Sequence, residues 1–291
     1  DIPADKQLVT TVETLVEARH FPLSCSPGDV AQRALRVNLS DIAAMGAVPH
    51  WFTLALTLQT PNEKWLHSFS EALESDALKF DCTLVGGDLT QGPLSITIQV
   101  FGTVDKNQAI KRTGLGLGDH IYVTGKLGAA AAAIACFEKS TQPMSLISNK
   151  VSEHLHNKFF RPEPRIKEGI ILRNIASAAI DISDGLIADL NHILRSKSYG
   201  ADIEFKLVPY EDFLIDIADK DLIQEWTLTS GDDYELCFTV PEKNIDLLER
   251  LIYEKKIHAC YIGKVTENPG IRCYDDQGNL LNLGKSGYQH F

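Results

Sequence analysis

Apolar residues recur at regular spacing along most of the chain and outline its elements. In residues 61–80, Trp65, Leu66, Phe69, Leu73 and Leu78 fall on one broad face, which predicts an amphipathic helix. Apolar runs predict strands over residues 7–16, 50–58, 82–90 and 94–104. A further helix is expected over residues 26–47, beginning after Pro27 and Gly28 with Asp29 as its cap.

The second part of the chain repeats this style after a glycine-rich connector, RTGLGLGDH, at residues 112–120. A strand, a loop and a helix are expected over residues 121–139, and a strand over NIASAAI, residues 174–180. A helix follows, with Leu186, Leu190, Ile193 and Leu194 at helical spacing. A polar turn then leads into a strand within residues 227–240. We therefore expect an α/β protein of the α+β type with two domains, residues 1–118 and 119–291.

The sequence DISDGL, residues 181–186, places several polar groups on a turn between a strand and a helix. Ser183 or Asp184 is suited to cap the helix, and acidic residues suit a helix N-terminus. Capping does not explain Asp181, which lies at the end of the strand. A cap and a binding site are therefore two open interpretations of this turn.

Acidic residues recur on other turns of the same kind. They are Asp41 in VNLSD, Asp88 in VGGDLT, Asp181 and Asp184 in DISDG, and Asp232 and Asp233 in SGDDYEL, with Glu13 and His20 near the first strand. Each acidic residue could simply be a turn or cap residue without a binding role, and His20, taken by itself, could be a core histidine. As a set they lie where ligands gather in α/β folds. Carboxylates without a Cys/His cluster favour Mg²⁺ over zinc.

Composition and charge narrow the classes of function. The chain has 28 basic and 39 acidic residues and a net charge of −11, which argues against nucleic-acid binding. An anionic substrate is compatible with this charge if divalent metals mediate the contact. No stretch resembles a transmembrane helix, and no signal-peptide pattern opens the sequence. The six scattered cysteines resemble reduced core thiols, so a cytoplasmic protein without membrane partners is expected.

Several longer motifs together resemble one family. They are ALRVNLSDIAAMGAVP, LVGGDLTQGPLSITIQVFG, RTGLGLGDHIYVTG, RPEPR, AIDISDGLIADL, GDDYELCF and the final GYQHF. This combination, from about residue 5 to the C-terminus, is similar to the bacterial thiamine-monophosphate kinases of the aminoimidazole-ribonucleotide-synthetase-like superfamily. The resemblance implies a two-domain fold with mixed sheets, a homodimer paired through the first sheet, and ATP and substrate between the domains. The implied reaction transfers the γ-phosphate of ATP to thiamine monophosphate.

The resemblance also assigns roles by position. Thr11, Val12, Glu13, Asp41, Asp88, Asp181 and Asp184 correspond to the Mg²⁺ site, Gly87, Asp88, Arg112 and Ser183 to the ATP site, and His20, Asp232 and Lys285 to the substrate site. The helix start after DISD would also offer N–H groups to a phosphate. No catalytic base is expected, because a phosphate acceptor is largely dianionic at pH 7.

Three features depart from the family pattern. The family has a metal-binding GDD loop upstream of the first strand, and this chain starts after that point. The family's first strand carries S-T-D-T, whereas this chain has Thr11-Val12-Glu13-Thr14, and glutamate is one methylene longer. Lys285 stands where the family commonly has an aromatic residue that stacks on the substrate. These departures concern catalytic rate and metal count more than fold.

Two alternatives remain beside the kinase. A sister synthetase of the same superfamily would also use ATP but would form its own product. A non-catalytic protein would bind ATP and Mg²⁺ without turnover. The final GYQHF favours the kinase.

Overall fold

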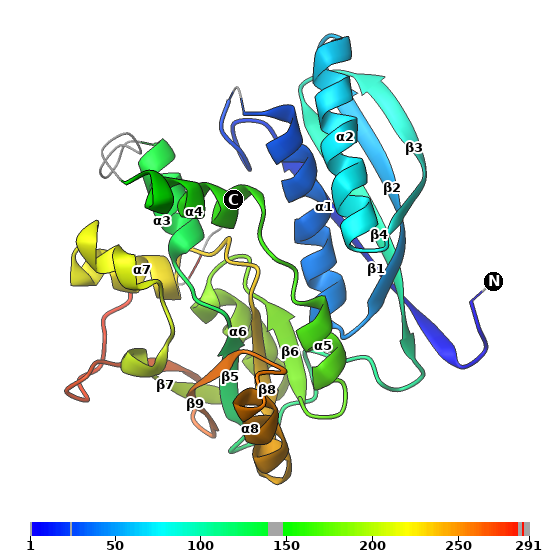
Figure 1. Ribbon diagram of the computed structural model, residues 1–291. Coiled ribbons are helices and arrows are strands. Elements are labelled where there is room, and N and C mark those ends of the chain that lie inside the picture. The colour runs from blue at the N-terminus through cyan, green and yellow to red at the C-terminus, as the bar shows by residue number, and fades with distance from the viewer. Residues whose placement is uncertain (1, 24, 139–147, 285–286, 288–291) are drawn as a thin grey trace.

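Two sheets organise the fold, one in each half of the molecule (Figure 1). The computed structural model describes residues 2–23, 25–138, 148–284 and 287. The N-terminal half contains β1 (Lys6–Val16), α1 (Pro27–Ala44), β2 (Val48–Leu58), α2 (Glu63–Lys79), β3 (Thr83–Gln91) and β4 (Ser95–Asp105). The expected α/β class and mixed sheets are confirmed, whereas the domain division at residue 118 stays a prediction.

The C-terminal half is built around the larger sheet. It contains β5 (His120–Thr124), α3 (Ala129–Phe137), α4 (Asn149–Phe160), α5 (Ile166–Leu172), β6 (Ala178–Asp181), α6 (Leu186–Leu194), β7 (Gly200–Glu204), α7 (Lys220–Leu228), β8 (Leu236–Val240), α8 (Ile245–Tyr253), β9 (Ala259–Thr266) and β10 (Gly270–Tyr274). Short 3-10 helices cover Arg195–Lys197, Phe205–Leu207, Asp212–Asp216 and Glu242–Asn244. Strands run in the order β10-β7-β9-β5-β8-β6. Helix α6 packs on one face of this sheet, and α5 and α8 pack on the other.

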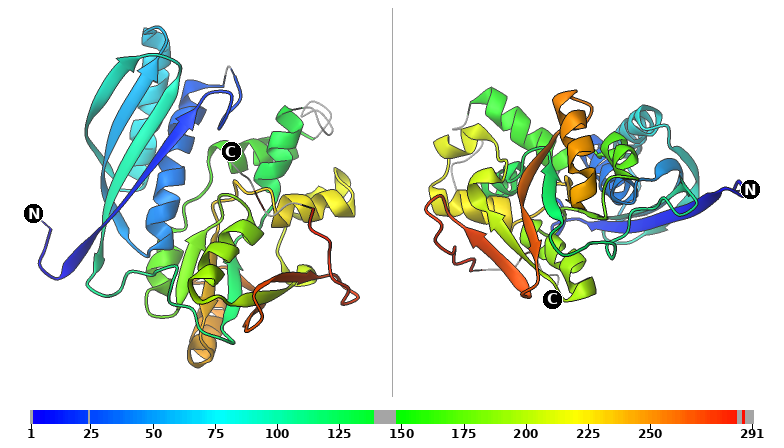
Figure 2. Two further views of the ribbon diagram at one scale, coloured as in Figure 1. Left: turned by 180° about the vertical axis from the view of Figure 1, so that it is seen from behind. Right: turned by 90° about the horizontal axis from the view of Figure 1, so that it is seen from below.

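The smaller sheet has the order β1-β4-β2-β3 and packs one face against α1 and α2. Strand β4 shows why: Ile96, Ile98 and Val100 are buried toward the helices, and the residues between them face away. On β1, Thr11 and Glu13 share the helix side with buried Val9 and Leu15. Figure 2, left, shows the other face of the sheet turned toward the viewer, with α1 and α2 behind it.

Local expectations were wrong at four places. Asp41 and Asp88, which were expected on turns, lie inside α1 and inside β3. Helix α1 is capped by Ser26, whose Oγ accepts the N–H of Asp29 at 3.3 Å, and Asp29 lies in the first turn. Pro27 explains the shift, because its fixed φ and missing N–H suit the first helical position. The strand expected over 174–180 begins only at Ala178. The backbone N–H groups of Ile175 and Ala176 donate to the carbonyl of Leu172, so this stretch continues the turn after α5.

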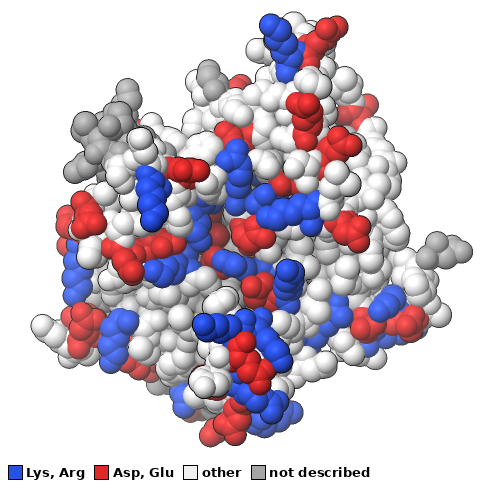
Figure 3. All heavy atoms as spheres, in the orientation of Figure 1, with Lys and Arg blue, Asp and Glu red and all other residues white. Residues whose placement is uncertain are grey.

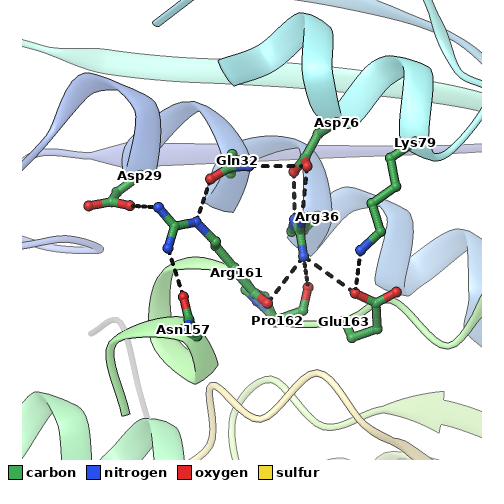
Figure 4. Close-up of polar contacts among 9 residues, drawn as sticks. All are labelled: Asp29, Gln32, Arg36, Asp76, Lys79, Asn157, Arg161, Pro162 and Glu163. Carbon is green, nitrogen blue, oxygen red and sulfur yellow. Dashed lines mark hydrogen bonds and ion pairs between the residues drawn. The ribbon is translucent and has the colours of Figure 1, made fainter. Parts of the chain in front are cut away.

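A polar network joins the two halves beside the connection from α4 to α5 (Figure 4). Arg36 of α1 donates to both carboxylate oxygens of Asp76 in α2, at 2.5 and 2.8 Å, and to the carbonyls of Arg161 and Pro162. Arg161 in turn donates to Asp29 at 2.6 Å. Arg36 and Asp76 are both buried, so the network fixes α1 and α2 against the C-terminal half.

The surface carries both signs of charge. Figure 3 shows basic and acidic side chains interspersed on the face seen in Figure 1, with a group of them where the two halves meet. In the described part of the chain, every helix is too short or too polar to cross a membrane.

Candidate active site

A cavity of about 1260 Å³ lies between the two halves. Its walls come from β1, the connection from β1 to α1, α1, α3, α7 and the loops before α6 and β8. Many of the residues singled out in the sequence line it: Glu13, His20, Asp41, Asp181, Ser183, Asp184 and Asp232. These residues come from both halves, so the fold assembles the site from segments far apart in the chain.

A second cavity of about 370 Å³ adjoins the first at Asp41, which lines both. Thr11 and Arg112 line this smaller space. The Thr11 hydroxyl donates to Asp41 Oδ2 at 2.6 Å, linking β1 to α1. Asp41 of α1 therefore faces two neighbouring cavities, and Arg112 is close enough for its charge to act on this carboxylate.

The carboxylates of the larger cavity influence one another. Burial and the charges of Asp41 and Asp184 raise the pKa of Glu13 to about 7. Burial and the charge of Asp41 also raise the pKa of Asp181, and a hydrogen bond from Ser40 Oγ at 2.8 Å opposes this. Burial raises the pKa of Asp41, against the hydrogen bond from Thr11 and the charge of Arg112. A bound cation would relieve this mutual repulsion.

The turn DISDGL is ordered by a residue that follows it. The carboxylate Oδ2 of Asp189 accepts the backbone N–H groups of Ser183 and Asp184 at 2.9 and 3.0 Å. Gly185, with φ 116°, stands at the N-cap of α6 and makes no side-chain cap. Neither Ser183 nor Asp184 is thus the cap of α6, and the offer of N–H groups from the helix start to a phosphate stays a prediction. Asp181 and Asp184 are left as members of the cavity wall.

His20 and Asp232 both line the larger cavity and come from different halves of the chain. The backbone N–H of Val16 donates to His20 Nδ1 at 3.0 Å, so the proton of the neutral ring is on Nε2. Asp232, with φ 64°, accepts a hydrogen bond from Arg33 at 2.7 Å. Arg33 was missed in the sequence. Its charge could have drawn attention to it, because Arg33 lies within the otherwise apolar stripe of α1 formed by Val30, Ala34 and Val37.

Other expected site residues lie elsewhere. Gly87 and Asp88 are on β3, at the far edge of the sheet from β1. A Cβ on Gly87 would lie 1.9 Å from the carbonyl oxygen of Leu54, so this position needs glycine. Val12 is 57% exposed on the face of β1 opposite Thr11 and Glu13, so only its backbone could serve as a ligand. Lys285 lies outside the described residues.

The donor set fits Mg²⁺ better than a metal that needs a protein cage. No group of three or more His, Cys, Asp or Glu among the described residues is arranged to enclose a metal by itself. Mg²⁺ is commonly held by one or two carboxylates, with water and substrate phosphates as its other ligands. Glu13, Asp41, Asp181 and Asp184 offer such carboxylates in one cavity.

Comparisons with known proteins agree with this architecture. Residues 1–104 match the N-terminal domain of AIR synthase related proteins, and residues 116–276 match the C-terminal domain. The chain thus belongs to the AIR synthase related class of two-domain proteins. It is 43% identical to a thiamine-monophosphate kinase of Buchnera aphidicola and 42% identical to that of Escherichia coli K12, covering all of this chain and 89% of each relative. Within the class, the chain is a member of the thiamine-monophosphate kinase family.

Solved structures give the same relationship. A thiamine-monophosphate kinase from Stenotrophomonas maltophilia K279a matches with a TM-score of 0.88 and 37% identity, over 96% of this chain and 87% of that one. A structure described as AaThiL complexed with AMPPCP and TMP matches with a TM-score of 0.85 and 26% identity, over 100% of this chain and 89% of that one.

Proposed function

We propose that this chain transfers the γ-phosphate of ATP to thiamine monophosphate and forms thiamine diphosphate, the last step of thiamine diphosphate biosynthesis. The observation that carries the proposal is the cavity between the halves, where Glu13, Asp41, Asp181 and Asp184 face a common space. The relatives that share the full length of the chain are named for this reaction. The AaThiL structure, described with AMPPCP and TMP, supports the same pair of substrates.

The residues of the site fall into three groups in this proposal. Glu13, Asp41, Asp181 and Asp184, with Thr11, the Val12 backbone and Asp88, hold Mg²⁺; Gly87, Asp88, Arg112 and Ser183 contact ATP; and His20, Asp232 and Lys285 contact thiamine monophosphate. Mg²⁺, when bound, neutralises charge on the phosphates. Thr11 orients Asp41 by its hydrogen bond, and Ser40 does the same for Asp181. Asp189 keeps the turn that carries Asp184 in place.

Phosphoryl transfer requires these residues mainly to position the two phosphates and to reduce the repulsion between them. A phosphate acceptor with a second pKa near 6 is largely dianionic at pH 7, so no protein base has to activate it. The barrier is the approach of two anionic groups, whose unit charges repel by roughly 4 kcal/mol at about 4 Å and an effective dielectric near 20. Arg112 places positive charge beside Asp41 and Asp181, where the phosphates would meet. Phosphoryl transfer depends mainly on such positioning and electrostatic stabilisation.

The place of Asp88 supports a homodimer. Gly87, Leu54, Ile98 and Glu13 are aligned in one row across β3, β2, β4 and β1. Three strand spacings of about 4.8 Å separate the outer strands by roughly 14 Å. Asp88 therefore lies too far from Glu13 to share a phosphate with it within one chain. In a dimer joined edge to edge, the partner subunit's Asp88 would come beside Glu13.

The two outer strands, β1 and β3, also carry exposed apolar residues of the kind found on strands that pair with another subunit. Leu84, Val85 and Leu89 of β3 and Leu8 and Val12 of β1 are exposed apolar residues. Exposed apolar edge strands are pairing sites unless they are covered. The cytoplasm is the proposed location, because the six cysteines are all free thiols, as in reducing compartments.

The test is formation of thiamine diphosphate from thiamine monophosphate, ATP and Mg²⁺, followed with ADP release. The chain and a version extended upstream, if the gene encodes one, should both be assayed. Product from either supports the proposal, and the difference between them measures the contribution of the upstream segment. Binding of ATP without product from both would overturn it and favour a sister enzyme or a non-catalytic binding protein.

A further inference from the structure

Arg33 of α1 is a buried cation beside the larger cavity and is only 2% exposed. Its guanidinium donates from each of its nitrogens to a different segment. Nε donates to the carbonyl of His20 at 3.2 Å, one terminal nitrogen to the carbonyl of Phe159 at 2.6 Å, and the other to Asp232 Oδ1 at 2.7 Å. One side chain thus ties together the connection from β1 to α1, the end of α4 and the loop before β8.

Aromatic rings hold the plane of the same guanidinium. Its Cζ lies 4.1 Å from the ring centroid of Phe159 and 5.7 Å from that of Tyr234. A planar cation stacked on aromatic faces with directed hydrogen bonds has little freedom to rotate. The distance between the backbone of His20 and the carboxylate of Asp232 is therefore set by a rigid group.

We propose that Arg33 is a positioning residue for the phosphate acceptor. It sets the spacing of His20, from the N-terminal half, and Asp232, from the C-terminal half, so that both meet one bound molecule. This inference rests on the proposed function, in which those two residues contact thiamine monophosphate. Lysine in place of Arg33 would keep the charge but would lose the fixed fork that reaches three segments at once.

Arg36 provides a matched control on the same helix. It is also buried, at 6% exposure; it bonds to Asp76 of α2 within its own half and to the carbonyls of Arg161 and Pro162 in the other half. It does not line the larger cavity. Arg36→Lys therefore reproduces the loss of a buried guanidinium from α1 without disturbing His20 or Asp232.

The experiment compares the parent chain with Arg33→Lys, Arg36→Lys, Asp232→Asn and the double variant Arg33→Lys/Asp232→Asn. The KM for thiamine monophosphate, the KM for ATP, kcat and the thermal midpoint are measured for each, together with the Kd of thiamine monophosphate by calorimetry. Arg33→Lys should raise the KM and Kd for thiamine monophosphate about tenfold or more, as expected for a lost charge-assisted hydrogen bond. The KM for ATP should stay within about twofold, and Arg36→Lys should lower the midpoint while leaving both KM values within about twofold.

The double variant tests whether Arg33 acts through Asp232. If it does, the double variant should be little worse than the more affected single variant, since both changes remove the same contact. Equal losses of midpoint in Arg33→Lys and Arg36→Lys, with no change in the KM for thiamine monophosphate, would make Arg33 merely structural. Independent, multiplying effects of Arg33→Lys and Asp232→Asn would also overturn the proposal.

A further variant covers the case in which Arg33→Lys does not fold. Phe159→Leu removes the nearest ring but leaves the charge, so it should loosen the guanidinium and raise the same KM by a smaller factor. An unchanged KM in Phe159→Leu would then overturn the proposal. A parent chain that neither binds nor phosphorylates thiamine monophosphate would instead overturn the proposed function, and this inference with it.

Discussion

The carboxylate of Asp189 lies 2.9 Å from the backbone nitrogen of Ser183 and accepts its hydrogen bond, from the first turn of α6 back to the loop before it. The same oxygen accepts the N–H of Asp184. A residue inside the helix thus shapes the turn on which Asp184 faces the cavity.

Substitutions of Asp189 should separate the effect of its hydrogen-bond acceptor from the effect of its charge. Asp189→Ala leaves two backbone N–H groups without their acceptor and should cost about 1–3 kcal/mol of unfolding free energy. It should also lower kcat, because Asp184 loses its position. Asp189→Asn keeps an oxygen acceptor and should retain most of the activity. Equal effects of both substitutions, measured by denaturant unfolding and initial rates, would contradict this account.

The charge of Asp189 predicts a pH dependence of stability. Burial raises the pKa of Asp189 to about 7, from 3.8. Between these values the folded chain keeps a proton that the unfolded chain releases, so this group's contribution to stability falls as pH rises from about 4 to about 7. The thermal midpoint of Asp189→Asn should therefore gain on the parent as pH rises through this range. Asp221→Asn, at an exposed position in the first turn of α7, is the control for loss of an acidic side chain from the start of a helix.

Asp41→Asn should abolish turnover but keep the fold. The amide oxygen can still accept the hydrogen bond from Thr11, and loss of the charge relieves repulsion with Glu13 and Asp181. We expect kcat to fall by at least about a hundredfold, as for other charged groups that stabilise a transition state. The thermal midpoint should equal or exceed that of the parent. A large loss of stability would show that Asp41 is a structural residue of α1.

The raised pKa of Glu13 predicts that the Mg²⁺ concentration needed for activity depends on pH. With a pKa of about 7 at Glu13, a proton would compete with Mg²⁺ at the proposed site near neutral pH. The Mg²⁺ concentration for half-maximal rate should fall as pH rises from about 6 to about 8, across that pKa. Glu13→Gln should need more Mg²⁺ and lose this part of the pH dependence, whereas Glu13→Asp should keep it. A pH profile identical in the parent and Glu13→Gln would remove Glu13 from the metal site.

Mixed dimers can test whether a partner completes the site. Asp41→Asn and Asp88→Asn should each be inactive alone. When the two variants are mixed and allowed to exchange subunits, one of the two sites regains both carboxylates if the partner subunit's Asp88 is used. Activity should then reappear in the mixture. If Asp41 and Asp88 serve the same site within one chain, every site keeps one substitution and no activity returns.

The network between the halves predicts unequal costs for its members. Arg36→Met leaves Asp76 buried without its partner and should cost about 3–5 kcal/mol of unfolding free energy. Lys79→Ala removes a half-exposed ion pair with Glu163 and should cost about 0–1 kcal/mol. Comparable losses in denaturant unfolding would mean that the buried Arg36–Asp76 pair between α1 and α2 contributes no more than an exposed ion pair.

The sequence was informative wherever one element determines its own pattern. The amphipathic helix over 61–80 became α2, and the run over 94–104 became β4, because each places its apolar residues on one packed face. Asp189 and Arg33 make contacts of a kind that such patterns do not predict. Asp189 acts on residues before its own helix, and Arg33 acts on Phe159 and Asp232, which are 126 and 199 positions away. Contacts over such separations depend on the tertiary structure and leave no periodic signal.

The candidate site was predictable as a set of residues but not as an arrangement. Motifs led to Asp41, Asp181 and Asp184, which share the larger cavity. The same motifs gave no indication that Asp88 lies on β3, at the opposite edge of the sheet from β1. The spacing of residues within a motif carries no information about the order of strands in a sheet. Of the two interpretations of DISDGL, the structure excludes Ser183 and Asp184 as caps of α6, and the binding site stays a prediction that their place in the cavity wall supports.

Helix α1 limits how this protein can be recombined with its relatives. Arg33, Arg36 and Ser40 all lie on it, and their partners include Asp232, Pro162 and Asp181 of the C-terminal half. A chimera that joined this N-terminal half to the C-terminal half of another family member would have to match all three contacts at once. The two halves are therefore expected to have been inherited as a pair, and productive crossovers should keep α1 together with its C-terminal partners.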